Sequence, residues 1–360
     1  MISPLAYVDA SAKLGANVTV HPFAYIDKNV EIGDDCEIMP HVSIMSGTRM
    51  GKRNRIFNGA VIAAEPQDFN YKGDDTIVEI GDDNVIRENV VINRATNSGG
   101  KTIIGNGNFL HEGVHVSHDT HIGNHSVFGY GSKISGNCMI EDYVIFGGNV
   151  LVSQGCRVGT WSMTQTGCRF RKDVPPYIVA ALEPTTYYGV NSVILMHEGM
   201  SEKIVKHISH AYRIIYQGNT SIFDALLMIK DQVPMSDEIQ HIIDFNLLDT
   251  FTVEDNIFLP LVLAGKNYKQ MSEKLKPIAA NLGITEILKK YPYEISGGQK
   301  QRAAVARALI TNPKLVLADE PTGALDSKAT EELLRLFGKI NMLGQTIIMV
   351  THSVKAASSA

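Results

Sequence analysis

The residues best suited to chemistry lie between His115 and His121, where three histidines occur close to Asp119. Imidazole titrates near neutral pH, and histidine is the side chain that most often takes a proton from a hydroxyl group. Asp119 follows His118 directly, so its carboxylate can orient the ring. The segment therefore predicts general-base catalysis. Solvated surface histidines and a metal site are the alternatives.

A six-residue repeat positions this segment. A large apolar side chain, here called the guide residue, recurs at every sixth position from Val8 to Ile62, from Ile80 to Ile92 and from Ile104 to Val158. Neither a helix nor an ordinary strand has this period, whereas a parallel β-helix built from hexapeptides does. In such a helix each hexapeptide makes one side of a triangular prism, and the guide residues fill its core.

Residues four positions after the guide residues should also point into the core, and they must be small. These positions include Cys36, Cys138 and Cys156. Free cysteine behaves as a small buried apolar residue. We therefore interpret these three cysteines as core residues and predict neither a disulfide nor a metal site. Cys168 lies beyond the repeat and receives no assignment.

The six-residue repeat also helps to choose between a general base and a metal site in the histidine segment. Val116 is a guide residue and points inward, so His115 points outward and His118 lies at a corner, facing solvent or a neighbouring segment. His115 and His121 are one hexapeptide apart and lie on different faces, which scatters ligands that zinc needs within about 2.1 Å. The spacing therefore favours a base at His118 over a metal site.

The composition argues against several functions. The 360 residues carry 33 basic and 38 acidic side chains, a formal net charge of -5, so no broad basic surface attracts nucleic acid. Residues 1–10 lack the pattern of a signal peptide, and no apolar stretch approaches the roughly 18 residues of a membrane span. We expect a cytoplasmic protein that neither binds nucleic acid nor spans a membrane.

Two stretches break the repeat, at about residues 63–75 and 94–101. Insertions in a repeat usually leave the coil as loops on a binding face, so both are candidate substrate-binding arms. After Val158 the repeat fades, and Pro175-Pro176 ends it. Apolar residues at helical spacing between residues 201 and 246 then predict a helical cap.

Several motifs, taken in order, resemble the family of UDP-N-acetylglucosamine O-acyltransferases that opens lipid A biosynthesis. They are Pro66-Gln67-Asp68, His115-x-x-His118-Asp119, Asp173-Val-Pro-Pro176-Tyr177 and Tyr187-x-Gly189-Val-Asn191. The resemblance covers about residues 1–245. It implies a left-handed parallel β-helix over residues 1–190 and an α-helical C-terminal domain over residues 191–246. It also implies a homotrimer, transfer of a 3-hydroxyacyl chain from acyl carrier protein to the 3-hydroxyl of UDP-N-acetylglucosamine, and no diffusible cofactor.

The same resemblance implies roles for individual residues. His118 would be the general base, Asp119 its orienting partner, and the Gly136 backbone N–H a donor to the oxyanion, a term that is often large in catalysis. The residues expected to bind substrate are Gln67, Asp68, His115, Gln154 and Asn191. Turn and loop capping is the alternative role for such Asn and Asp residues.

Some positions depart from the family pattern. Asn70, Asn137 and Ser153 stand where lysine, histidine and histidine are usual, and Thr166 replaces a glycine beside the acyl tail. Glu198 stands where a pair of arginines would hold the diphosphate, and a carboxylate repels phosphate. These changes keep two alternatives open, a relative with a changed donor or acceptor and a silent prism that acts as a scaffold.

Residues 247–360 resemble a different protein, an ABC transporter ATPase. The signature is Ser296-Gly297-Gly298-Gln299, the Walker B strand ends in Asp319-Glu320, the D-loop is Ala324-Leu-Asp326, and the switch histidine is His352. The resemblance implies that Asp319 serves the Mg²⁺ shell, that Glu320 polarises water and that His352 contacts the γ-phosphate. We therefore expect an incomplete α/β ABC ATPase fragment and interpret the chain as a chimera.

The phosphate-binding Walker A loop is missing from this fragment. Such a loop needs glycines and a Gly-Lys-Ser/Thr end to wrap phosphates, and the nearest string, Ala95 to Thr102, lies inside the hexapeptide repeat. We expect ATP and Mg²⁺ to bind only if a partner completes the site. An ABC-type ATP-binding subunit completed in this way is the alternative function.

Overall fold

The chain forms two compact units, Met1–Phe245 and Asn246–Ala360. The structure, a computed structural model, describes residues 1–351 except 183, 219, 221, 250–251, 264–265, 292–294, 320, 322–326 and 343.

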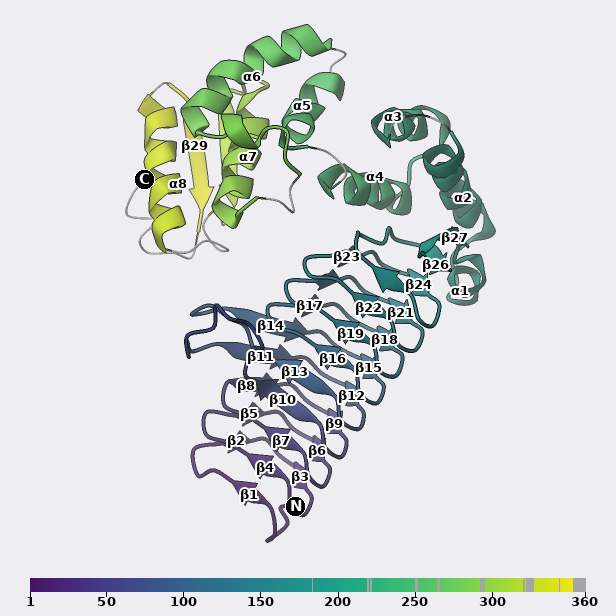
Figure 1. The fold of residues 1–360 in the computed structure, drawn as a ribbon, viewed down its shortest axis with the longest axis vertical. Helices are drawn as coiled ribbons and strands as arrows, with labels where there is room; N and C mark the ends of the chain where they lie inside the picture. Colours follow the sequence, from purple (N-terminus) through teal and green to yellow (C-terminus); the bar gives the residue numbers. More distant parts are fainter. Residues whose placement is uncertain are drawn as a thin grey trace. The chain divides into compact units, whose positions relative to one another are not determined.

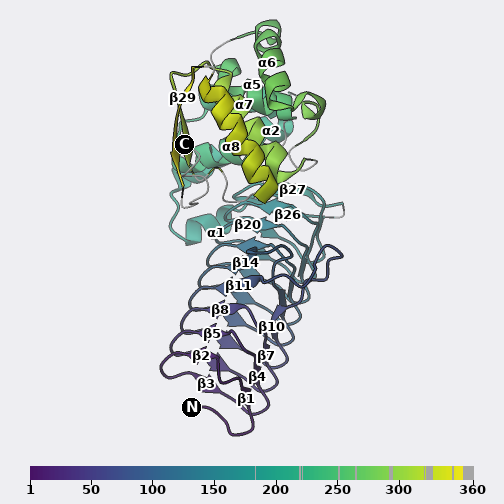
Figure 2. The ribbon, with the colours of Figure 1, turned by 90° about the vertical axis from the view of Figure 1, so that its left-hand side faces the viewer.

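The first unit is built from short strands that stack coil upon coil (Figure 1). Within residues 1–182 the strands form the three faces of a prism. Face 1 contains β1 (Tyr7–Val8), β4 (Tyr25–Ile26), β7 (Ser43–Ile44), β10 (Val61–Ala64), β13 (Val91–Asn93), β16 (His115–Val116), β19 (Lys133–Ile134), β22 (Leu151–Val152) and β25 (Arg169–Phe170). Face 2 contains β2 (Lys13–Leu14), β5 (Glu31–Ile32), β8 (Thr48–Met50), β11 (Ile77–Ile80), β14 (Lys101–Ile104), β17 (His121–Ile122), β20 (Met139–Ile140) and β23 (Arg157–Val158), and several of these stand in one column in Figure 2.

Face 3 contains β3 (Thr19–Val20), β6 (Glu37–Ile38), β9 (Arg55–Ile56), β12 (Val85–Ile86), β15 (Phe109–Leu110), β18 (Val127–Phe128), β21 (Ile145–Phe146), β24 (Met163–Thr164) and β26 (Ile178–Ala181). An antiparallel strand, β27 (Thr186–Val190), pairs with β26 at its end. All other pairings in the prism are parallel, as in Val116 with Ile134. This is the parallel β-helix that the hexapeptides predict, left-handed as the family resemblance implies.

Burial in the prism follows the six-residue period. Guide residues such as Ile26, Ile92 and Ile134 are fully buried, and the small residues four positions later are buried too. Cys138 is one of these, and burial raises the pKa of its thiol to about 11, which keeps it protonated and unreactive. Cys168, which received no assignment, is also buried. The cysteines of the prism are core residues.

The corners of the prism have one recurring backbone conformation. The third residue after the guide residue usually has a positive φ, as in Asn89 (56°), Asp119 (57°) and Asn137 (58°). Asn, Asp and Gly adopt this left-handed conformation most readily. This requirement explains why Asn, Asp and Gly are frequent at the corners.

Helices cap the prism at its C-terminal end. They are α1 (Ser192–His197), α2 (Glu202–Gln217), α3 (Ile222–Gln232) and α4 (Asp237–Asp249). The Tyr212 hydroxyl of α2 donates to the Pro176 carbonyl at 2.6 Å. His241 of α4 lies 3.0 Å from Glu141 of the prism. The cap is thus hydrogen-bonded to the last coils.

The second unit has its own core. Its elements are α5 (Val253–Leu263), α6 (Tyr268–Leu282), the 3₁₀-helix η1 (Thr285–Ile287), α7 (Gly297–Leu309), β28 (Leu315–Asp319), α8 (Ser327–Met342) and β29 (Thr346–Val350). Strands β28 and β29 pair in parallel. One side of this pair packs on the helices, while Leu317 and Ile348 on the other side are exposed. The unit is therefore an α/β fragment with an uncovered sheet face.

Candidate active site

His118 and Asp119 lie in the turn between β16 and β17, at the corner where face 1 meets face 2. The inward-pointing Val116 anchors this turn in the core. His118 is 8% exposed, so it faces neighbouring segments rather than open solvent.

The His118 ring is flanked by two carboxylates. Its Nδ1 lies 2.9 Å from Oδ2 of Asp119, and its Nε2 lies 3.4 Å from Oδ2 of Asp68. Asp68 comes from the first insertion, residues 63–75, which brings a residue 50 positions earlier in the chain to the same corner. The predicted base, its predicted orienting partner and one predicted substrate-binding residue therefore form one cluster.

The second insertion, residues 94–101, holds the Asp119 carboxylate. The Thr96 N–H and hydroxyl both donate to Oδ2 of Asp119, at 3.1 and 2.7 Å. The Asp119 N–H donates to the Thr102 hydroxyl at 2.9 Å. The sequence indicated this loop as a candidate substrate-binding arm but gave no sign of the contact between Thr96 and Asp119. No periodic pattern places an irregular loop against a corner 23 residues away.

Arg94 connects the two insertions. Its guanidinium donates to the Tyr71 hydroxyl at 2.7 Å and to the Ser46 carbonyl at 3.1 Å. Within the first insertion the Asn70 N–H donates to Oδ1 of Asp68 at 2.7 Å. Asn70 therefore contacts Asp68 through its backbone N–H, a hydrogen bond that does not depend on the Asn70 side chain.

Gly136 packs against the His118 ring from the next coil. A Cβ atom at Gly136 would lie 2.4 Å from Cε1 and 2.6 Å from Nε2 of His118, closer than any side chain can approach. The Gly136 N–H donates to no residue that the structure describes. This backbone donor is consequently available beside the ring.

The remaining predicted substrate-binding residues lie at different distances from this cluster. Gln67 adjoins Asp68 and is exposed, and Gln154 is exposed one coil beyond Gly136 at the same corner. His115 is half-buried on face 1, where burial, followed by the nearby Lys133 charge, lowers the pKa of its imidazole. These three residues lie around the cluster of His118, Asp119 and Asp68 and are not part of it.

Asn191 is placed differently. It is 3% exposed, and its side-chain amide donates to the Trp161 carbonyl at 3.0 Å. That bond ties the start of α1 to the prism. Nearby, Nδ1 of His197 lies 2.9 Å from Oε1 of Glu198, so the Glu198 carboxylate has an imidazole as its neighbour.

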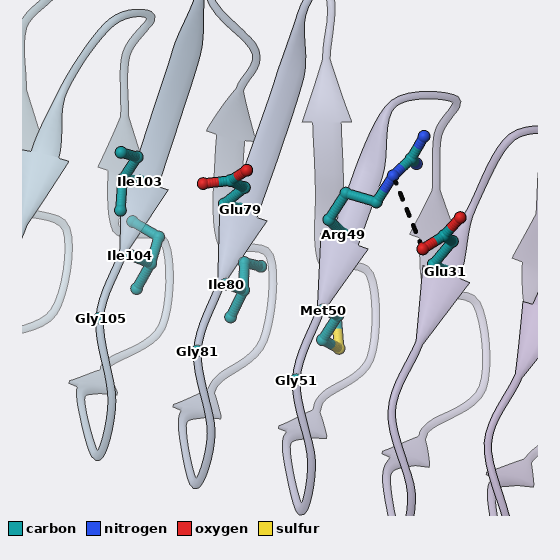
Figure 3. Close-up of a pocket in the computed structure, with 10 residues that line it drawn as sticks. All are labelled: Glu31, Arg49, Met50, Gly51, Glu79, Ile80, Gly81, Ile103, Ile104 and Gly105. Atoms are coloured by element: carbon teal, nitrogen blue, oxygen red, sulfur yellow. Dashed lines mark ion pairs between the residues drawn. The ribbon is translucent and has the colours of Figure 1, made fainter. Parts of the chain in front are cut away.

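A groove on the outside of face 2 is separate from this corner (Figure 3). It is lined in part by Glu31, Arg49, Met50 and Glu79. Arg49 lies 3.9 Å from Glu31, and Glu79 lies 2.7 Å from Lys101. Its charged side chains are ion-paired, and it contains none of the predicted site residues, so it is not the candidate site.

In the second unit the ABC motifs occupy the expected elements where they are described. Ser296 caps α7 and forms reciprocal hydrogen bonds with Gln299, and Gly297 and Gly298 open the helix. Asp319 ends β28. Glu320, His352 and the D-loop from Ala324 to Asp326 lie outside the described residues.

Among the described residues, no three His, Cys, Asp or Glu side chains are arranged to hold a metal ion. No helix in the described part of the chain is long and apolar enough to cross a membrane.

A hexapeptide prism with a histidine between carboxylates at a corner defines the class of hexapeptide-repeat transferases. The family model of bacterial transferase hexapeptides matches residues 101–136, and the model of UDP-N-acetylglucosamine O-acyltransferase domain 2 matches residues 173–249. The chain is 42% identical over 247 residues to the acyl-acyl-carrier-protein UDP-N-acetylglucosamine O-acyltransferase of Xanthomonas axonopodis pv. citri, covering 68% of this chain and 94% of that protein. The chain belongs to the UDP-N-acetylglucosamine O-acyltransferase family and is an enzyme of that type.

A solved structure agrees with this assignment. The UDP-N-acetylglucosamine acyltransferase of Bacteroides fragilis is 52% identical, with a TM-score of 0.67, over 68% of this chain and 96% of that chain. The C-terminal part is similar to a second family instead. It is 55% identical over 116 residues to the bacitracin export ATP-binding protein of Halalkalibacterium halodurans, which covers 32% of this chain and 46% of that protein. The chain thus spans about half the length of the ABC relative that it matches.

Proposed function

We propose that residues 1–246 transfer a 3-hydroxyacyl chain from acyl carrier protein to the 3-hydroxyl of UDP-N-acetylglucosamine, as the first step of lipid A synthesis. The observation that carries this proposal is the His118 ring, flanked by Asp119 and Asp68 and packed on the Gly136 backbone. We infer no diffusible cofactor, because base, carboxylates and backbone donor together supply the groups that acyl transfer needs.

The hydrogen bonds of Asp119 support a distinct role for each ring nitrogen of His118. An ionised carboxylate only accepts hydrogen bonds, so the proton shared with Asp119 belongs to Nδ1 of His118. Nε2 is then the atom that gains and loses a proton. A hydrogen bond from Nε2 to Asp68 requires a proton on Nε2. In the reactive form Nε2 carries no proton, and the sugar hydroxyl donates to it in place of the contact with Asp68.

The proposed acyl transfer has two steps, addition of the hydroxyl and loss of the thiolate. The sugar hydroxyl oxygen attacks the thioester carbonyl carbon while His118 Nε2 takes the hydroxyl proton. The Gly136 N–H donates to the oxyanion that forms, and such preorganised donors commonly contribute about 10²–10³-fold to the rate. Collapse breaks the carbon–sulfur bond, and His118 returns its proton to the departing thiolate.

The test is acyl transfer from 3-hydroxyacyl carrier proteins of several chain lengths to UDP-N-acetylglucosamine, measured with residues 1–360. Product formation is expected. If a well-folded chain forms no product with any acyl length, the proposal is wrong, and the alternatives of a changed substrate or a silent scaffold replace it.

We also propose that the active form is a homotrimer joined through face 3. The outward positions of this face carry a continuous apolar column, Val85, Phe109, Val127, Ile145 and Met163, whose members are paired in neighbouring strands. Each is half-buried in the single chain. Burying such a column against other copies is favourable at about 25 cal/mol per Å².

Val127→Asp is expected to convert the trimer into monomers, because a carboxylate in a buried interface lacks solvation. Light scattering after size-exclusion chromatography measures the mass. Met139→Asp on face 2, where Met139 is 47% exposed, is the matched control and should remain trimeric. A trimer that persists in Val127→Asp, or one lost equally in Met139→Asp, would contradict the assignment to face 3.

The second unit is expected not to hydrolyse ATP. It has the Walker B residue Asp319 at the end of β28, but the sequence supplies no loop to wrap the phosphates. Phosphate release by residues 1–360 should equal the background seen with Asp319→Asn, and acyl transfer should persist in residues 1–246. ATP turnover that Asp319→Asn abolishes would show instead that the fragment is completed.

A further inference from the structure

Thr96 makes two hydrogen bonds to Asp119, the neighbour of the proposed base His118. It is 6% exposed, and both of its donors, the N–H and the hydroxyl, reach Oδ2 of Asp119. The same oxygen lies 2.9 Å from Nδ1 of His118. One carboxylate oxygen thus accepts from Thr96 twice and faces the ring that carries the proposed chemistry.

The loop that carries Thr96 is fixed to the rest of the prism on both sides. Before Thr96, the Asn93 side-chain amide donates to the Glu65 carbonyl at 2.6 Å, and the Arg94 N–H donates to the Ala64 carbonyl at 3.0 Å. After it, the Gly99 N–H donates to the Asp75 carbonyl at 3.2 Å. The residues on both sides of Thr96 are therefore hydrogen-bonded to the first insertion.

The Thr96 hydroxyl is also oriented by its neighbour. The Asn97 side-chain amide donates to the Thr96 Oγ1 at 3.2 Å, so the hydroxyl accepts from Asn97 and donates to Asp119. Chains of hydrogen bonds in poorly solvated surroundings reinforce one another. The direction of this chain runs from Asn97 through Thr96 to the carboxylate.

We propose that Thr96 is a positioning residue that sets the orientation of Asp119 and, through it, the tautomer and basicity of His118. This inference rests on the proposed role of His118. A carboxylate that already accepts two bonds attracts the protonated ring less than a bare carboxylate does. Thr96 thereby limits how strongly His118 retains its proton, while keeping the Nδ1 side of the ring in place.

Thr96→Val tests this inference, because valine keeps the shape and the backbone N–H but removes the hydroxyl. We expect kcat to fall by about 10–100-fold, the loss typical of a hydrogen bond to a charged group, with little change in KM. The acid limb of the pH–rate profile should move to higher pH, since the less-neutralised carboxylate holds the ring proton longer. Thr96→Ser should restore both kcat and the profile.

Thr48→Val is the matched control. Thr48 is fully buried, and its hydroxyl donates to the Met45 carbonyl at 2.8 Å and not to Asp119. It lies on β8, three strands before β17 in face 2. It should lower Tm without moving the pH profile. If Thr96→Val behaves in the same way, or if Thr96→Ser fails to restore the profile, Thr96 is a structural residue and the inference is wrong.

A second readout separates this inference from the proposed function. The ring ¹⁵N signals of His118, assigned by their absence in His118→Ala, report the tautomer without any turnover. A shift in these signals in Thr96→Val supports the positioning role even if the substrate differs from the one proposed. Unchanged signals contradict it even if the wild type transfers acyl chains.

Discussion

The His118→Ala variant is expected to lose acyl transfer by about 10²–10⁴-fold, the usual contribution of a general base. The loss should fall on kcat, because in the proposed mechanism the ring removes the hydroxyl proton in the transition state, while the two insertion loops remain. Steady-state kinetics at saturating acyl carrier protein substrate measures the effect. It is the largest single change that the proposed mechanism predicts, since Nε2 is the ring atom that would take the hydroxyl proton in place of its contact with Asp68.

The matched control is His121→Ala. His121 lies two residues beyond Asp119 on β17, where it is exposed on face 2 and paired through its backbone with Met139. It should retain wild-type kinetics. Similar losses in the two variants would mean that the histidine segment acts through stability, and the base would then have to be sought elsewhere.

The Gly136→Ala variant is expected to reduce kcat by about 100-fold or more. The added methyl group would lie 2.4 Å from Cε1 of His118, so either the ring or the Gly136 backbone must move. A displacement of about 1 Å can cost 10²-fold in rate. Both the base and the proposed oxyanion donor are affected together, which is why one methyl group should have so large an effect.

Gly338→Ala is the control for this substitution. Gly338 lies in α8 with nothing within 4 Å of an added Cβ, and alanine favours a helix over glycine by about 1 kcal/mol. It should leave acyl transfer unchanged and raise the thermal stability of the second unit slightly. Wild-type turnover by Gly136→Ala would show that the ring is not held against the Gly136 backbone during the reaction.

The fold could be predicted from the sequence because its period is long and regular. Each guide residue specifies its own inward direction and that of the small residue four positions later, and both sets are buried. The corner residue between them adopts a left-handed backbone, which explains Asp119 and Asn137. The motifs likewise indicated both families, and the comparisons confirm the acyltransferase family and the similarity to ABC ATPases.

The interior of the site could be predicted only in part. The His118–Asp119 pair is local, and the structure brings the two side chains together. The contacts from Asp68 and Thr96 come from insertions that follow no period, so the sequence indicated loops without showing which side chain reaches the corner. Asn191 could not be placed by motif alone either, since its amide bonds to the Trp161 carbonyl.

His118, Gly136 and Gln154 occupy equivalent places in successive coils, because Val116, Ile134 and Val152 are stacked in register. Adjacent strands are about 4.8 Å apart, so equivalent residues at one corner of the prism are evenly spaced along its axis. Within the regular coils, loss or gain of one hexapeptide would turn every later side chain onto another face, whereas loss or gain of a whole coil would only move it by one strand spacing along the axis. An insertion that leaves the coil as a loop, as between Ile92 and Ile104, keeps the later side chains on their faces. Viable length variants of this enzyme should therefore differ by complete coils or by loops that leave the coil, and both kinds keep His118, Gly136 and Gln154 at one corner.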